Sequence, residues 1–123
     1  MSDIEVLSGN LKFHYTETIA MLQMEPHEIE SKYGISFEEG CDDLEEFKAA
    51  FLRDKKTGKI FLLYRNKNQF ANTTDVIALR NEPLDPAADL LDFLKMMKLS
   101  TKDLFWINEV AMSADANVQA TNQ

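Results

Sequence analysis

The sequence predicts a single α+β domain: N-terminal helices, then a three-stranded antiparallel meander, then a C-terminal helix packed on the sheet. Three observations lead to this prediction. A polar turn at residues 54–59 separates two apolar runs, a third apolar run fills residues 74–80, and Asp85-Pro86 opens an amphipathic segment. Because the chain has 123 residues, 45% of them apolar, it can bury one core of ordinary size. We therefore expect one domain at residues 1–111 and a flexible C-terminal tail at residues 112–123.

The first third of the chain is expected to be helical. Residues 10–24 can form one helix with four apolar side chains on its inner face: Leu11, Tyr15, Ile19 and Leu22. The alternation of apolar and polar residues over 11–15 also suits a strand, and we take the helix. A second short helix is predicted at residues 26–33, with Pro26 at its start and Gly34 as a left-handed residue at its end.

The predicted meander occupies the middle of the chain. Residues 47–53 and 59–65 read as a hairpin, and residues 74–80 supply a third strand. Every residue of 60–64 is apolar, which is typical of a central strand covered on both faces. Residues 43–51 also fit a helix, but we take the strand because an isolated central strand needs a neighbour.

The C-terminal helix is expected to run from Pro86 to about Lys98, with Asp85 as its N-cap. Its apolar stripe consists of Leu90, Phe93, Leu94 and Met97. The polar positions predicted to face water are Asp89, Asp92 and Lys95.

A further helical turn is predicted directly after this helix. Ser100 can cap it, and Asp103 can return the bond in the manner of a capping box. The apolar residues 104–107 then follow. Trp106 could anchor a partner, since Trp is common at binding hot spots. We expect instead that these residues close the core.

Cysteine content and apolar runs predict a cytoplasmic protein. Cys41 is the only cysteine, so no intrachain disulfide can form, and its acidic surroundings disfavour a reactive thiolate. The longest uncharged apolar run, residues 60–64, is far shorter than the roughly 20 residues that cross a bilayer. Asp3 and Glu5 stand where a secretory signal carries positive charge. We therefore expect neither export nor a membrane partner.

Charge is distributed in blocks along the chain. The total of −8 divides into −10 for residues 1–46, +6 for residues 47–80 and −4 for residues 81–123. The densest acidic segment spans residues 37–46, and its carboxylates are the predicted partner-binding residues: Glu38, Glu39, Asp42, Asp43, Glu45 and Glu46. The same segment could instead be a solvated loop or could pair with the lysines and arginines that follow it.

Other kinds of site find little support in the sequence. His14 and His27 have no metal-ligand spacing to each other or to Cys41, so we expect no metal. No nucleophile elbow or phosphate-binding glycine loop is present, so we name no catalytic residue and no cofactor. The net negative charge opposes nucleic-acid binding.

Three hypotheses of function follow. The preferred one is a non-catalytic regulatory or inhibitory protein, immunity-like or antitoxin-like, that binds a basic protein partner through the acidic segment. The second is a small-molecule-binding domain or an enzyme, with a pocket between sheet and helices lined by polar groups such as His14, Tyr15 and Tyr64. The third is a self-associating structural subunit. The strand at residues 60–64 needs cover on its second face, which either the N-terminal helices or a second subunit of a homodimer can supply.

Overall fold

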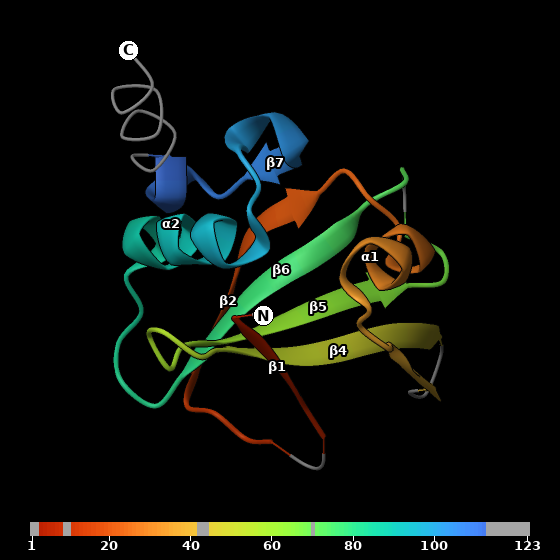
Figure 1. Ribbon diagram of the computed structural model, residues 1–123, viewed down its shortest axis with the longest axis horizontal. Helices are drawn as coiled ribbons and strands as arrows, with labels where there is room; N and C mark the ends of the chain where they lie inside the picture. Colours follow the sequence, from red (N-terminus) through yellow and green to blue (C-terminus); the bar gives the residue numbers. More distant parts are fainter. Residues whose placement is uncertain (1–2, 9–10, 42–44, 70, 113–123) are drawn as a thin grey trace.

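Seven strands form one antiparallel sheet, and both α-helices lie against the same face of it (Figure 1). The computed structural model describes residues 3–8, 11–41, 45–69 and 71–112. The strand order is β1-β4-β5-β6-β2-β7, and β3 pairs with β4 on the edge that β1 also uses. The strands are β1 (Ile4–Leu7), β2 (Tyr15–Leu22), β3 (Glu38–Cys41), β4 (Glu46–Asp54), β5 (Ile60–Asn66), β6 (Thr74–Arg80) and β7 (Leu104–Ile107).

The predicted meander is confirmed as the centre of this sheet, since β4, β5 and β6 are consecutive antiparallel neighbours. The turn between β4 and β5 is closed by the amide of Asp54, which donates to the Lys59 carbonyl at 2.8 Å. Gly58 adopts a φ of 78° there, a conformation that glycine reaches without strain. The prediction of only three strands is wrong, because four more strands extend the sheet.

The predicted helix at residues 10–24 is wrong: residues 15–22 form β2, which pairs with β6 along its whole length, and none of residues 11–24 is helical. The β-branched residues Thr16, Thr18 and Ile19 favour a strand, and β6 needs a neighbour on its second edge. The register shifts between Thr18 and Ala20, so Ile19 forms a bulge. As a result Ile19 and Ala20, although adjacent, are both fully buried.

The two helices are confirmed. Helix α1 (Pro26–Tyr33) ends at Gly34, whose φ of 70° is the left-handed conformation predicted for that position. Helix α2 (Pro86–Met97) begins at Asp85, whose side chain accepts a hydrogen bond from the Ala88 amide at 3.3 Å. None of the helices in the described residues has the length and apolar character needed to cross a membrane.

The core lies between the helices and the sheet. Phe61 of β5 and Phe93 of α2 meet edge to face, with ring centroids 5.2 Å apart. The Tyr33 hydroxyl donates to the Met97 carbonyl at 2.7 Å and so joins α1 to α2. Burial, together with the charge of Asp103, raises the pKa of Tyr33, so this hydroxyl stays protonated to a higher pH than that of an exposed tyrosine.

The prediction that Asp89 faces water is wrong. Its side chain is 1% exposed, and one carboxylate oxygen lies 2.8 Å from Arg80 Nη2 and 2.9 Å from Lys59 Nζ. Lys59 also pairs with Asp92. Desolvation lowers the pKa of Lys59, but the two carboxylates raise it by more, so the pKa lies above its ordinary value. Charge pairing across the helix–sheet boundary therefore explains why an acidic residue is buried in the first turn of α2.

The segment after α2 follows the prediction at its start and departs from it later. The 3₁₀ turn Thr101–Asp103 is capped as expected, because the Ser100 amide donates to Asp103 Oδ2 at 3.0 Å. Residues 104–107 then form the edge strand β7, where Phe105 is 52% and Trp106 43% exposed, so the prediction that these two close the core is wrong. A second 3₁₀ turn, Glu109–Met112, follows, and the predicted flexible tail beyond it lies outside the described residues.

Candidate functional site

A cavity of about 620 Å³ lies at one end of the sheet, between the start of α1 and the β3–β4 hairpin. The start of α1 contributes Glu25, Pro26 and His27 to its lining. Strands β3 and β4 contribute residues 39–41 and 46–48, the end of β5 contributes Arg65, and the turn after it contributes Lys67. The volume falls within the range of roughly 300–1,000 Å³ that is usual for small-molecule sites.

Three ion pairs line this cavity. Lys67 Nζ lies 3.0 Å from Glu46 Oε2, and Lys48 Nζ lies 3.8 Å from Glu39 Oε1. Arg65 Nη2 lies 3.9 Å from Glu25 Oε1. The cavity wall therefore presents both signs of charge, each next to its opposite.

The three cations differ in how firmly they are held. Arg65 is 15% exposed, and its guanidinium donates to the carbonyl oxygens of Gln69, Ala71 and Thr73, so the loop that follows β5 fixes its position. The side chains of Lys48 and Lys67 are 45% and 65% exposed, and their partner carboxylates are equally accessible or more so. The two lysine pairs can therefore open at little cost, because exposed pairs contribute about 0–1 kcal/mol each.

Gly40 and Phe47 also line the cavity, and the ring of Phe47 packs against the glycine. Gly40 pairs across the strands with Phe47, and a Cβ atom at residue 40 would lie 2.4 Å from the tip of that ring. The ring also stacks on Tyr64, with centroids 5.2 Å apart. Glycine at this position therefore allows the Phe47 ring to lie flat over β3, on the sheet face that it shares with Tyr64 and opposite the face of Glu39 and Lys48.

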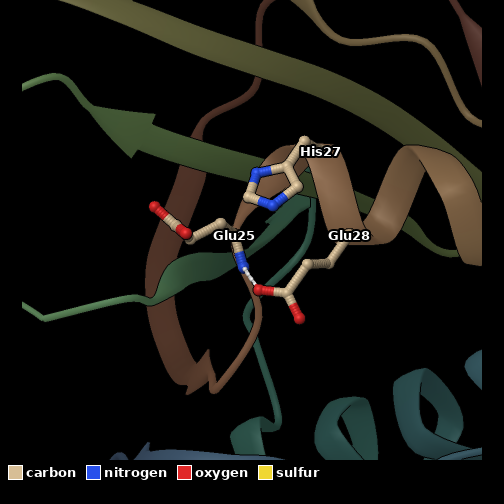
Figure 2. A group of neighbouring side chains, drawn as sticks. All are labelled: Glu25, His27 and Glu28. Atoms are coloured by element: carbon tan, nitrogen blue, oxygen red, sulfur yellow. Dashed lines mark hydrogen bonds between the residues drawn. The ribbon is translucent and has the colours of Figure 1, made fainter.

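Glu25, His27 and Glu28 are gathered at the start of α1, with their ligand-type atoms within 4.8 Å of one another (Figure 2). Glu28 Oε1 accepts a hydrogen bond from the Glu25 amide at 3.2 Å, which caps the helix. The Glu25 carboxylate points away from this bond, toward Arg65. The carboxylates thus have roles within the protein, and a metal ion is not needed to explain their position.

The predicted partner-binding residues are only partly brought together. Glu38 and Glu39 are exposed on β3, Glu46 is exposed at the start of β4, and Glu45 is half-buried. Glu39 and Glu46 line the cavity. Asp42 and Asp43 lie outside the described residues. The alternative of a solvated loop is therefore wrong for the described part of this segment, because that part belongs to the β3–β4 hairpin that lines the cavity.

The acidic and basic blocks of the sequence pair with each other in the fold. Of the eight basic residues at positions 47–80, seven form ion pairs with carboxylates: Lys48, Arg53, Lys56, Lys59, Arg65, Lys67 and Arg80. Five carboxylates from residues 1–46 take part: Asp3, Glu5, Glu25, Glu39 and Glu46. The surface around the hairpin is therefore more mixed in sign than the order of charges along the chain indicates.

A second hollow, of about 300 Å³, includes Met21, Tyr64 and Asp75 from three adjacent strands. Burial raises the pKa of Asp75, and this effect exceeds the opposing hydrogen bond from Gln69 Nε2 at 3.2 Å and the charge of Arg65. Of the residues predicted to line a pocket, Tyr64 is found here. His14 and Tyr15 are exposed and line neither this hollow nor the cavity.

No family model matches the sequence, and neither the curated proteins nor the solved structures contain a match to it. The site is therefore interpreted from its own geometry. Sequence reasoning missed His27, Lys48 and Arg65 as site residues. The sequence does place charged residues near the ends of the predicted strands. It does not show which strand ends lie side by side, because that depends on the order of the strands in the sheet.

Proposed function

We propose that this protein binds a small zwitterionic molecule, one that carries both a carboxylate and an amine, in the cavity beside the β3–β4 hairpin. The observation that carries the proposal is the lining of this cavity by three ion pairs. The proposal is for binding alone and assigns no chemical reaction to the residues that line the cavity.

The charge pattern of the wall favours a ligand with both signs. A ligand with a single charge can replace only one member of an ion pair, and the displaced member is then left without a partner. A zwitterion replaces both members, because its carboxylate takes the lysine and its amine takes the glutamate. The Glu39–Lys48 pair is the one we expect to open, since its separation of 3.8 Å is long and both side chains are exposed.

Three forms of one dipeptide can test this proposal: the dipeptide with free termini, its N-acetyl form and its C-terminal amide. Isothermal titration calorimetry of each against the full chain measures the affinity. We expect the free dipeptide to bind at least tenfold more tightly than either singly charged form, which corresponds to the loss of one charged hydrogen bond. Equal affinity for the three forms, or no binding by any of them, would reject the proposal.

Variants can locate the binding. Glu39→Gln and Lys48→Gln should each weaken binding of the free dipeptide about tenfold. The matched controls are Glu5→Gln and Arg53→Gln, because this pair is similarly exposed, with a separation of 3.0 Å, and lies on β1 and β4 away from the cavity. If Glu5→Gln or Arg53→Gln also weakened binding of the free dipeptide, the loss would reflect the overall charge of the chain and would not locate binding in the cavity.

A second candidate function is the regulatory or inhibitory binding of a basic protein. It is favoured by the exposure of the hairpin carboxylates, 78% for Glu39 and 65% for Glu46, whose lysine partners are replaceable by cations of another chain. Such a complex forms faster when the charges attract each other and weakens as salt screens them.

The test compares capture of proteins from cell extract by the native chain and by a variant with four carboxylates removed: Asp42→Asn, Asp43→Asn, Glu45→Gln and Glu46→Gln. We expect a basic protein that the native chain retains at about 0.05 M salt and releases at about 0.5 M, and that the variant does not retain. The same capture by both chains would reject this candidate.

A further inference from the structure

The sheet face that carries no helix is unusually apolar. The strand register places Phe51, Leu62 and Ile77 side by side on β4, β5 and β6, in one row across the centre of the sheet. The next row includes Tyr64 and Met21, and β7 adds Trp106 beside Met21. Large apolar side chains thus extend from β4 to the β7 edge.

This face is covered less well than its opposite. Along β5, the alternate residues Phe61 and Leu63 point to the helices and are 1% and 0% exposed. Ile60, Leu62 and Tyr64 point the other way and are only half-buried. Figure 1 shows both helices on the same side of the sheet, so no helix is left for the second face in the described part of the chain. A run that is apolar at every position, as residues 60–64 of β5 are, is typical of a sheet covered on both sides.

The central row of this face, which runs through Phe51, Leu62, Ile77 and Thr18, contains no charged residue, although the whole chain has a net charge of −8. On β1 and β4 the ionic groups of the face are Glu5 and Arg53, which neutralise each other at 3.0 Å. On β6 the face carries Asp75, whose carboxylate accepts from Gln69, and on β3 it carries Glu38, which lies opposite Ala49 of β4. Two copies of an acidic chain can therefore meet through this uncharged central row, with the charged groups of the face lying to either side of it.

We propose that this face is the interface of a homodimer, in which the sheets of two copies pack against each other. Six strands at about 4.8 Å spacing and seven residues at about 3.4 Å per residue give a face of about 700 Å². Two such faces bury about 1,400 Å² in total, which is within the range of stable specific interfaces.

A second copy is the occupant that suits this surface. A two-fold interface must be complementary to itself, and an apolar face of low charge meets that condition. Sheets that pack face to face lie about 10 Å apart, with their side chains interdigitated. The proposal is independent of the ligand proposed above, because Phe51, Leu62 and Ile77 do not line the cavity.

Sedimentation equilibrium of the full chain, from about 1 µM to about 1 mM, tests the proposal. We expect a dimer, and we expect the double variant Leu62→Thr/Ile77→Thr to raise its dissociation constant at least tenfold. Thr keeps the β-branched shape that strands favour, and far-UV circular dichroism reports whether the variant is folded. If the double variant is not folded, Trp106→Ala on the exposed β7 edge replaces it, and we expect this variant also to raise the dissociation constant at least tenfold.

The control is Val110→Thr, which alters an apolar residue that is 66% exposed on the second 3₁₀ turn. It should leave the dissociation constant unchanged. A monomer at every concentration would overturn the proposal, as would a dimer that the face variants do not weaken. If Phe105→Pro alone abolished that dimer, the interface would be the β7 edge instead, and the face proposal would again be wrong.

Discussion

Replacing Arg80 by methionine removes one of the two cations that neutralise the buried Asp89 carboxylate. Arg80 Nη2 and Lys59 Nζ both contact Asp89 Oδ1, at 2.8 and 2.9 Å. The second oxygen, Oδ2, is buried and has no hydrogen-bond partner within the described residues. After the change Lys59 alone must balance Asp89 and Asp92, so one buried negative charge is left without full compensation.

The magnitude follows from burial. Removing one partner of a buried ion pair typically costs about 3–5 kcal/mol, and because Lys59 remains beside Asp89 we expect the lower end, about 3 kcal/mol of unfolding free energy. For a chain of this length, that corresponds to a fall in Tm of about 10 °C. Arg53→Met breaks the Glu5 pair at a similar separation of 3.0 Å, but both of those side chains are more than 40% exposed. That control should lose less than about 1 kcal/mol.

Urea unfolding followed by far-UV circular dichroism measures both variants. The double variant Arg80→Met/Asp89→Leu completes a thermodynamic cycle: with both charges removed, it should be more stable than the sum of the single losses implies, by about 2 kcal/mol. The reasoning would be refuted if Arg80→Met lost no more stability than Arg53→Met, or if the two single losses simply added.

Three further predictions concern single residues. The pKa of Asp75 is raised in the folded state, so the contribution of this carboxyl to stability falls as the pH rises above 3.8, the ordinary pKa of the group. Asp75→Asn should therefore be more stable than the native chain at pH 7 and should lose that advantage below pH 3.8, as measured by urea unfolding midpoints. Gly40→Ala should lose about 1–3 kcal/mol in the same assay, because the new methyl group displaces the Phe47 ring, and an unchanged midpoint would contradict the packing described. The raised pKa of Lys59 gives stability that is complete below 10.5 and lost above it, so Lys59→Met should reduce the pH dependence of Tm in that alkaline range.

The centre of the fold could be predicted from the sequence because its signals are local. The turn around Gly58 lies between two apolar runs, so the β4–β5 hairpin and then β6 follow from residues close together in the chain. Both helices could be predicted for the same reason, since Pro26 and Asp85 mark their starts and Gly34 the end of α1.

The parts that were predicted wrongly depend on distant contacts. Residues 15–22 form a strand because β6, more than fifty residues later, offers an edge to pair with. Asp89 is buried because Arg80 reaches it from the end of β6 and Lys59 from the residue before β5, which no helical periodicity can reveal. Phe105 is exposed because β7 is the last strand of the sheet, not a segment folded into the core.

The candidate site was visible in the sequence only through Glu39 and Glu46. Their importance was inferred from the density of acidic residues, whereas the structure pairs each with a lysine across or beyond the hairpin. The pairing of Glu39 with Lys48 depends on the β3–β4 register, and β3 was not predicted as a strand. A count of charges along the chain therefore could not show that both signs meet at one cavity.

Backbone amide chemical shifts, recorded while a dipeptide with free termini is added, test most directly whether the cavity lined by the three ion pairs binds a zwitterion. We predict saturable shifts confined to the amides of Glu39, Lys48 and their neighbours at the start of α1, and we predict that the N-acetylated dipeptide needs at least a tenfold higher concentration to produce them. Shifts that spread along the helix-free sheet face, or that both dipeptides produce equally, would contradict the account.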